Sequence, residues 1–380
     1  MKKVVVLGAG MVGSVMACDL ASDLDVTIAD VREDALARAK TRAERAGRRL
    51  AIARADLSDP GAITRLVSSF DLAAGALASR LGYAALRAVI EAGKPYADIS
   101  FFAEDALDLD DLAKARGVTA VVDCGVAPGM SHMIAGHEAA QMDSPESLAI
   151  YVGGLPRERR RPFEYKAGFA PSDVIEEYTR PTRLVERGEV VVREALTEPE
   201  ALDIPGLGTL EAVNTDGLRS LVRTLRVPNM KEKTLRYPGH YDLMRVFRET
   251  GLFSTEPIEV GGVRVVPREV TSALMFPKWT YAPGEEDLTA MRITLEGSHE
   301  GRPRRVTWDL LDFFHRESGA TSMSRTTAFP CTTVLRMLAR GDVVGPGVLV
   351  PEFLGRRPGV LKHVIDEQKK RGVVYHRREE

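Results

Sequence analysis

The sequence predicts an α/β protein, in which a doubly wound parallel sheet is followed by an α+β domain with an antiparallel or mixed sheet. Three observations support this fold class. The 380 residues exceed what one ordinary hydrophobic core holds, so two domains are expected. Strand and helix patterns alternate regularly up to about residue 122, and hairpin-like patterns follow. The composition, with 44% hydrophobic and 28% charged residues, is typical of a soluble globular enzyme.

A glycine-rich turn follows the first predicted strand, at residues 2–7, and precedes a helix-like stretch at 14–20. A helix N-terminus offers unpaired N–H groups and a partial positive charge to a pyrophosphate. The first glycine of the turn allows its sharp bend, the second lets phosphates approach the backbone, and the third lets the helix pack on the strand. This pattern is typical of a Rossmann-type domain, and the turn residues expected to bind a dinucleotide are Gly8, Gly10, Met11, Val12 and Gly13.

The second predicted strand, at residues 25–29, is followed by Asp30 about twenty residues after the turn. An acid at this place accepts hydrogen bonds from the adenosine ribose hydroxyls and repels a 2′-phosphate. The sequence therefore favours NAD over NADP. Arg32 keeps NADP open, because an arginine here can stack on adenine or bind that phosphate.

The βα alternation continues with helices at 32–46 and 82–92 and with strands at 50–55, 70–74, 95–99 and 118–122. Ligands of such sheets bind at the carboxyl ends of the strands. Two places at these ends are therefore expected to border the cofactor. Asp56 and Leu57 are predicted beside the adenine, and Gly75 and Leu77 beside the nicotinamide. For Asp56, a helix cap before Pro60 is an equally good interpretation.

The pattern changes after residue 122, where a turn-rich crossing leads into a helix predicted at 132–142 and capped by Ser131. Helix patterns return at 326–340 and 359–370. Between the helices at 132–142 and 326–340, strands are expected, some of them in hairpins, at 148–152, 183–186, 189–193, 263–269, 291–296 and 304–311. The predicted division is an NAD-binding domain at 1–123, a substrate and dimerisation domain at 124–325, and a C-terminal helical segment at 326–380 that packs back on the first domain.

Charge and cysteine content limit the partners. With 52 Lys+Arg against 54 Asp+Glu the net charge is −2, and no long block of one sign suggests a nucleic-acid or membrane surface. No run is long enough to span a bilayer, and the first strand begins too early for a signal peptide. The three cysteines are far apart and odd in number, which argues against a disulfide framework and a zinc site. We expect a cytoplasmic protein without a metal, acting on a small molecule.

Five short segments carry a family resemblance: GVAPG at 125–129, GGLP at 153–156, FEYK at 163–166, NTDGL at 214–218 and KTLRYPGH at 233–240. They resemble the saccharopine dehydrogenase-like oxidoreductases over nearly the whole chain, and within that family most resemble the lysine 6-dehydrogenases. The resemblance implies NAD-dependent oxidation of the ε-amine of lysine. The products are ammonia and 2-aminoadipate 6-semialdehyde, which cyclises to piperideine-6-carboxylate. A homodimer or higher homo-oligomer is also expected.

Three positions depart from the pattern of the saccharopine reductases. Phe101, Ala127 and Val152 stand where that pattern has a tyrosine, an aspartate and a cysteine. Apolar walls suit a pocket that does not hold the glutamate half of saccharopine. This favours lysine, with Phe101 and Val152 lining its chain.

A lysine pocket needs a cation for the α-carboxylate and partners for the amines. Arg236 is expected to bind the carboxylate as a bidentate pair, and Tyr165 and Tyr237 to hydrogen-bond either end of the substrate. Asp98 and Asp123 end the fifth and sixth strands, where they can hold an ammonium. A structural ion pair for Arg236, and hydrogen bonds from loop N–H groups to Asp98, are the competing interpretations.

The chemistry also needs a base that leaves the ε-nitrogen neutral before the hydride departs. His240 is the expected base, because the ordinary pKa of histidine lies near the working range. Lys166 is a second candidate if it is desolvated. His240 as a cap of the Pro238-Gly239 turn, and Lys166 as a solvated side chain, are the structural alternatives.

Two other functions stay open. A saccharopine or carboxynorspermidine dehydrogenase would form or cleave a secondary amine on the same scaffold. A catalytically idle NAD-binding regulator is the alternative from another class.

Overall fold

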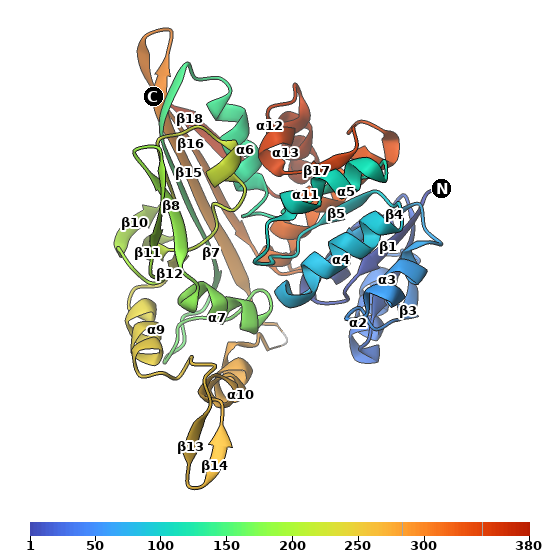
Figure 1. Cartoon of the computed structure of the whole chain (residues 1–380), viewed down its shortest axis with the longest axis horizontal. Helices are drawn as coiled ribbons and strands as arrows, with labels where there is room; N and C mark the ends of the chain where they lie inside the picture. The colour runs from blue at the N-terminus through green and yellow to red at the C-terminus, as the bar shows by residue number, and fades with distance from the viewer. Residues whose placement is uncertain (283, 344) are drawn as a thin grey trace. The chain divides into compact units, whose positions relative to one another are not determined.

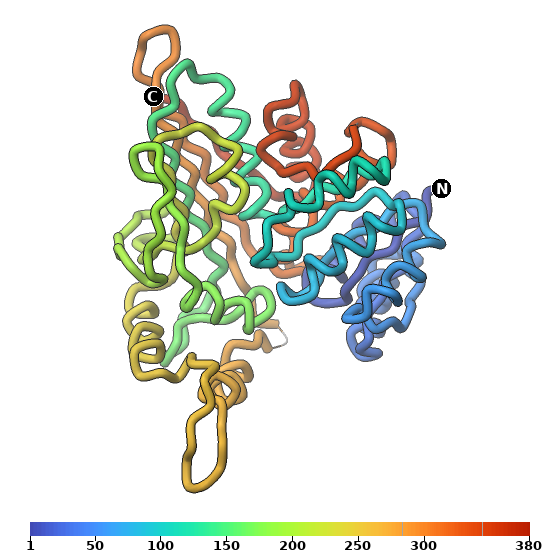
Figure 2. Tube along the Cα trace, in the orientation of Figure 1, coloured from blue at the N-terminus to red at the C-terminus, as the bar shows by residue number. Residues whose placement is uncertain are grey.

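The computed structural model describes residues 1–282, 284–343 and 345–380 (Figures 1 and 2). The chain divides into two compact units. The first consists of Met1–Gln141, His315–Ala320 and Ser324–Val374, and the second of Met142–Phe314, Thr321–Met323 and Tyr375–Glu380. Among the described residues, none of the helices combines the length and apolar composition that crossing a bilayer requires.

A parallel sheet forms the centre of the first unit, in the strand order β17-β6-β5-β4-β1-β2-β3. Most of its strands are short, buried apolar runs, as expected where helices cover both faces of a parallel sheet, whereas the edge strand at residues 51–54 is largely exposed. The order reverses at β1, so β4 lies beside β1 and the predicted switch point is present. The six predicted strands are confirmed near their expected positions, as β1 (Lys3–Leu7), β2 (Asp25–Asp30), β3 (Ala51–Arg54), β4 (Leu72–Gly75), β5 (Tyr96–Asp98) and β6 (Thr119–Val121). The seventh strand, β17 (Gly347–Leu349), was not predicted.

Helices connect these strands and cover the sheet (Figure 1). Local signals fix several of their ends. Asp59 begins one helix, since its side chain accepts the N–H of Gly61 and Pro60 occupies the first turn. The helices of this unit are α1 (Met11–Leu20), α2 (Glu33–Arg45), α3 (Pro60–Val67), α4 (Ser79–Glu91), α5 (Asp110–Ala115), α6 (Met130–Ala139), α12 (Pro351–Gly355) and α13 (Val360–Lys370), with a 3₁₀ turn at Ala106–Leu109 and most of α11 (Ser322–Arg340).

Helix α6 lies in the first of the two compact units. It begins at Met130, after Gly129 as its N-cap, and Ser131 does not cap it. The hydroxyl of Ser131 instead lies 2.9 Å from Nδ1 of His132. The helix belongs to the first unit because it packs tightly on α12, where a Cβ at Gly136 would overlap the carbonyl oxygen of Glu352. By compactness the second unit starts at Met142, whereas the predicted division by function has its boundary at residues 123 and 124.

The second unit is built on a mixed sheet in the order β10-β11-β12-β7-β15-β16-β18, with β8 and β9 joined at β12. Strands β7 and β12 pair in parallel, and their other neighbours are antiparallel. The strands are β7 (Ser144–Pro156), β8 (Thr182–Glu186), β9 (Glu189–Arg193), β10 (Glu200–Ile204), β11 (Gly208–Asn214), β12 (Asn229–Arg236), β15 (Asp287–His299), β16 (Arg302–Phe313) and β18 (Tyr375–Glu379).

Helices α7 (Pro171–Thr179), α8 (Leu221–Thr224), α9 (His240–Glu249) and α10 (Pro267–Trp279) accompany this sheet, and β13 (Ile258–Val260) and β14 (Val263–Val265) form a separate hairpin. The strand predicted at 263–269 was wrong in its second half, because Pro267 starts α10. The chain end also departs from the prediction. Strand β18 pairs with β16 in the second unit, so the segment after residue 374 does not belong to the first.

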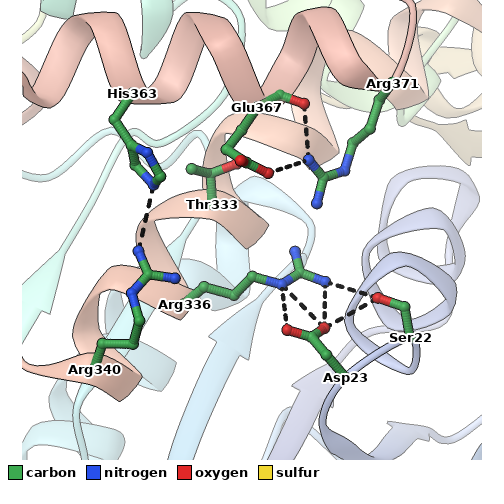
Figure 3. A pocket seen from close by; sticks show the side chains of 8 residues that line it. All are labelled: Ser22, Asp23, Thr333, Arg336, Arg340, His363, Glu367 and Arg371. Carbon is green, nitrogen blue, oxygen red and sulfur yellow. Dashed lines mark hydrogen bonds and ion pairs between the residues drawn. The ribbon is translucent and has the colours of Figure 1, made fainter.

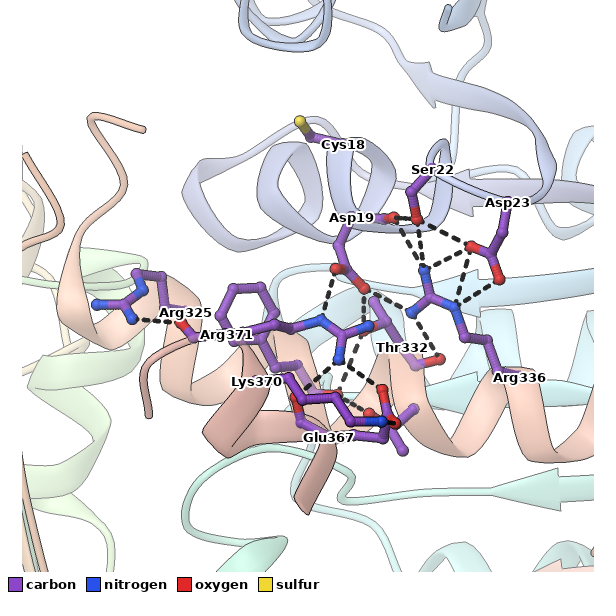
Figure 4. A network of polar contacts seen from close by, with 12 residues as sticks. Cys18, Asp19, Ser22, Asp23, Arg325, Thr332, Arg336, Glu367, Lys370 and Arg371 are labelled. Carbon is purple, nitrogen blue, oxygen red and sulfur yellow. Dashed lines mark hydrogen bonds and ion pairs between the residues drawn. The ribbon is translucent and has the colours of Figure 1, made fainter. Parts of the chain in front are cut away.

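A buried ionic network joins the C-terminal helices to α1 within the first unit (Figure 4). Asp19 accepts hydrogen bonds from Nη1 of Arg336 in α11, at 2.6 Å, and from Nε of Arg371 after α13, at 2.8 Å. Thr332 adds a third hydrogen bond to the same carboxylate, at 2.7 Å. Burial opposes the ionisation of Asp19, but the charges and hydrogen bonds of the two arginines outweigh it and lower the pKa of this carboxyl.

Asp19→Asn should therefore lower the free energy of unfolding by about 3 kcal/mol at pH 7, because it leaves two largely buried guanidinium groups without their shared carboxylate. A lowered native pKa means that the contribution is present above the pKa of the unfolded state and is lost as the pH falls through the native value. Urea unfolding at pH 7 measures the change. Asp34→Asn, which removes the exposed pair with Arg38, is the control and should stay close to wild type. An equal effect of both variants would contradict the anchoring role.

Candidate functional site

The glycine turn of the first unit has the geometry that a dinucleotide needs. Gly8 has a positive φ of 105°, and a Cβ on it would overlap the carbonyl oxygen of Ala76. A Cβ at Gly13 would overlap the carbonyl oxygen of Gly8. A Cβ at Gly10, by contrast, would meet no atom of the described residues within 4 Å. Packing within the protein thus requires the outer glycines, while the middle one borders open space at the start of α1, where a pyrophosphate would fit.

Asp30 lies against this turn. It is 9% exposed, and one carboxylate oxygen accepts the N–H of Ala9 at 2.8 Å. The other oxygen accepts the N–H of Arg32 at 2.9 Å, while Nε of Arg32 is 3.6 Å away. The carboxylate is therefore fixed at the end of β2 and keeps acceptor capacity for ribose hydroxyls. The side chain of Arg32 is exposed beside it.

Asp56 and Leu57 make contacts within the protein. Asp56 accepts hydrogen bonds from the N–H and the hydroxyl of Ser58, at 2.9 and 2.6 Å, and these bonds lower its pKa. The cap of α3 is Asp59, not Asp56. The side chain of Leu57 is buried in the core of the unit. Both residues lie after β3, and their contact with adenine stays a prediction.

Asp98 and Asp123 lie at the carboxyl ends of β5 and β6, and both are buried. Asp98 is 0% exposed and accepts the N–H and the hydroxyl of Ser100, at 2.9 and 2.7 Å. Burial raises the pKa of Asp98 to about 7, against the hydrogen bonds from Ser100, and the neighbouring Asp123 adds to the rise. Asp98 thus has the loop contacts that the structural interpretation expected. Phe101, the residue after Ser100, is half-buried.

The second unit gathers three of the predicted residues, Arg236, Tyr165 and His240, around one buried charge. Arg236 is 2% exposed. Its Nη2 donates to Glu177 at 2.9 Å and its Nε to the hydroxyl of Tyr178 at 3.1 Å, while the ring of Tyr165 lies 4.5 Å from the guanidinium carbon. The guanidinium therefore has an ion pair with Glu177 in this structure, and a substrate carboxylate would have to share it or replace it.

His240 is held at both ring nitrogens. Nδ1 lies 2.9 Å from the carbonyl oxygen of Phe163, which can only accept, so this nitrogen carries the proton. Nε2 then accepts the hydroxyl of Tyr178, also at 2.9 Å. Burial, and after it the charge of Arg236, lower the pKa of His240 to about 3. The imidazole is therefore neutral, and its basic nitrogen is occupied by Tyr178.

The remaining predicted residues of the second unit lie outside this cluster of contacts. The hydroxyl of Tyr237 donates to the carbonyl oxygen of Pro156 at 2.9 Å. Nζ of Lys166 donates to the carbonyl oxygen of Thr280 at 2.9 Å and forms an ion pair of 2.6 Å with Glu285. Val152 is buried on β7, where it is paired with Thr234.

Sequence reasoning missed Glu177 and Tyr178. Both lie on α7, more than fifty residues before Arg236, and their segment reads as an ordinary helix with a mixed surface. Burial raises the pKa of Glu177, although Arg236 opposes the rise. An acidic pair followed by tyrosine gives no sequence signal of a buried ion pair, so only the fold reveals these partners.

A surface pocket of about 230 Å³ lies elsewhere in the first unit (Figure 3). The guanidinium groups of Arg336 and Arg371 are paired with carboxylates of the ionic network around Asp19, and that of Arg340 is paired with Asp342, so we assign the pocket to that structural anchor. It is lined by Ser22, Asp23, Thr333, Arg336, Arg340, His363, Glu367 and Arg371. In the part of the chain that the structure describes, no three His, Cys, Asp or Glu side chains form a group that would hold a metal ion.

Two known proteins are similar to this chain at low sequence identity. The alpha-aminoadipic semialdehyde synthase of Mus musculus is 23% identical over 82% of this chain, and the chain spans only 41% of its length. The saccharopine dehydrogenase (NADP+, L-glutamate-forming) of Schizosaccharomyces pombe is 20% identical over 78% of this chain and 82% of its own.

Solved structures confirm the predicted fold class. The apo saccharopine dehydrogenase (L-Glu forming) of Saccharomyces cerevisiae matches with a TM-score of 0.80 at 17% identity, over 100% of both chains. The homospermidine synthase of Legionella pneumophila, solved with NAD, matches with a TM-score of 0.61 at 12% identity, over 99% of this chain and 91% of its own. At these identities the likeness concerns the fold.

Two family models confirm the resemblance predicted from the five short segments. The model described as the saccharopine dehydrogenase NADP binding domain matches residues 4–121, and the saccharopine dehydrogenase C-terminal domain matches residues 125–373. The first model and the glycine turn together support a pyridine nucleotide as the cofactor. With both models in their expected order along almost the whole chain, the protein belongs to the saccharopine dehydrogenase family of oxidoreductases.

Proposed function

We propose that this chain is an NAD-dependent amine dehydrogenase that oxidises the ε-amine of L-lysine to 2-aminoadipate 6-semialdehyde and ammonia. The choice of lysine as the substrate rests on the apolar character of Phe101, Ala127 and Val152 in a chain of the saccharopine dehydrogenase family. These positions offer no donors to the two carboxylates of a glutamate moiety. The homo-oligomeric state and the cytoplasmic location predicted from the sequence belong to the same proposal.

A saccharopine dehydrogenase is the second candidate. Relatives that carry this name support it, among them the S. pombe enzyme and the S. cerevisiae structure. It would act on a secondary amine, and the comparison of substrates below separates it from the lysine reaction.

When bound, the nicotinamide takes up the hydride, and the other tasks belong to side chains of the protein. In this proposal Asp30 holds the adenosine ribose, and Asp56 and Leu57 border the adenine. Gly75 and Leu77 border the nicotinamide. Asp98 and Asp123 serve the amine at the strand ends, while Tyr237 and Lys166 assist at the other end of the substrate.

Arg236 and His240 are coupled in the proposed mechanism. The charge of Arg236 is the second cause of the low pKa of His240. A substrate carboxylate beside Arg236 would offset that charge and would raise the pKa of the imidazole. His240 would then accept a proton once Tyr178 turns away from Nε2. Binding of the carboxylate thus prepares the base.

The proposed role of Asp30 in selecting NAD over NADP can be tested by substitution. Asp30→Asn keeps the shape of the side chain and removes the charge that would meet a 2′-phosphate, so NADP should gain on NAD by about 1–3 kcal/mol in kcat/KM. Steady-state rates with both nucleotides measure this, and Asp25→Asn at the exposed start of β2 is the control. A wild-type preference for NADP would contradict the assignment of Asp30.

Replacement of His240 tests the base. His240→Asn should lower kcat on the order of 10²–10⁴-fold with little change in KM. A loss below about tenfold would leave His240 with a purely structural role.

The same variant also changes the pH dependence of stability. The native pKa of about 3 lies below the ordinary value of 6.5, so wild type loses stability as the pH falls below about 6.5, where the unfolded chain takes up a proton. Denaturant unfolding between pH 7 and pH 5 should show that His240→Asn removes this part of the slope. An unchanged slope would contradict the neutral, buried imidazole.

A comparison of lysine with saccharopine tests the role proposed for Phe101, Ala127 and Val152. Burying the extra carboxylates of saccharopine without donors costs several kcal/mol, whereas the chain of lysine carries no such group. Lysine should therefore exceed saccharopine in kcat/KM by a factor on the order of 10³. NADH formation with each substrate, measured on one preparation, decides the matter. Comparable values, or a preference for saccharopine, would favour the second candidate.

A further inference from the structure

The glycine turn packs against the turn that follows β4, at residues 75–77. The carbonyl oxygen of Ala76 lies so near Gly8 that a Cβ there would overlap it, and a Cβ at Gly13 would lie 3.2 Å from Cβ of Ala76. The N–H of Ala76 donates to the carbonyl oxygen of Leu7 at 2.9 Å. Any movement of Ala76 would therefore displace the turn that is expected to hold the pyrophosphate.

The side chain of Ser100 accepts a hydrogen bond from the next residue of this turn, Leu77. The N–H of Leu77 donates to Oγ of Ser100 at 3.1 Å. Because a backbone N–H can only donate, Oγ is the acceptor there, and the hydroxyl proton is free to go to Oδ1 of Asp98 at 2.7 Å. Oδ1 also accepts the N–H of Ser100 at 2.9 Å. Ser100 is 2% exposed, so water does not replace these bonds.

Close packing fixes the place of Ser100 and Asp98. A Cβ at Gly82 of α4 would lie 2.7 Å from Cβ of Ser100, so the helix leaves no room for a larger residue at either position. A Cβ at Gly75 would overlap the carboxylate of Asp98 and the hydroxyl of Tyr96. Glycine at the end of β4 thus lets the Asp98 carboxyl lie close to the turn after β4. Ser100 connects this carboxyl to the turn through its hydroxyl.

We propose that Ser100 is a positioning residue for the nucleotide. Through the bonds from Leu77 to Ser100 and from Ser100 to Asp98, it fixes the turn at residues 75–77, and that turn fixes the glycine turn. Ser100 itself need not touch the ligand. The inference rests on the nucleotide binding of the proposed function and is independent of the substrate.

Ser100→Ala is the decisive variant, because it keeps the Cβ that packs on α4 and removes only the hydroxyl. Hydrogen exchange on the protein without ligand should show the Leu77 amide exchanging at least about tenfold faster, since its acceptor is lost. The Kd for NADH, followed by fluorescence, should rise roughly 3- to 10-fold, the scale of one hydrogen bond. Ser68→Ala, on the exposed end of α3, is the matched control and should change neither value.

The outcomes separate this inference from the proposed function. An unchanged Leu77 exchange rate, or an unchanged Kd beside normal binding by wild type, would overturn the role of Ser100 alone. Wild-type protein that binds neither NADH nor NADPH would overturn the proposed function and the inference with it. If Ser100→Ala does not fold, wild type still provides a test: the Leu77 amide should be among the protected amides of the unit, and rapid exchange there would contradict the hydrogen bond to Ser100.

Discussion

The contact between the backbones of Gly8 and Ala76 is the constraint on which the nucleotide-binding unit depends. Strands β1 and β4 are neighbours at the point where the strand order reverses, so their following turns meet at one edge of the sheet. Two turns can approach this closely only where side chains are absent or small, as they are at Gly8, Gly13 and Ala76. The glycines therefore serve two purposes: two of them join the turns, and Gly10 leaves room for the ligand.

The second unit depends on a different constraint, the desolvated charge of Arg236. A buried guanidinium without partners would cost several kcal/mol, so Glu177, Tyr178 and Tyr165 must surround it. These partners hold His240 in turn, because the Tyr178 hydroxyl that accepts from Arg236 donates to Nε2. Burial is the first cause of the pKa shifts of Glu177 and His240; the charge of Arg236 opposes the rise at Glu177 and adds to the fall at His240. A rigid cluster of this kind suits a binding site, since its geometry is fixed before a ligand arrives.

Strands β1 to β6 of the parallel sheet were predictable from the sequence because each is a short, mainly apolar run between helical patterns, whereas β17 was not predicted. Strand β12 was not predictable, since Lys231, Glu232 and Lys233 look like a solvated segment, whereas in the structure Glu232 and Lys233 are buried and Lys231 is half-buried. The glycine turn and Asp30 were predictable because their spacing is local. The partners of Arg236 were not, because Glu177 is 59 residues away in the sequence and no periodicity links the two.

The titratable groups at the predicted site residues favour one kind of ligand for the proposed function. Burial moves the pKa of Asp98 up and that of His240 down, so both shifts favour the neutral form. The charges that persist beside His240 are the paired Arg236 and Glu177. A ligand of one sign would satisfy one member of this pair and leave the other buried without a partner, at a cost that binding has to overcome. A zwitterion such as the amino-acid substrate of the proposed function would avoid that cost, because its carboxylate would meet Arg236 while its ammonium would meet Glu177.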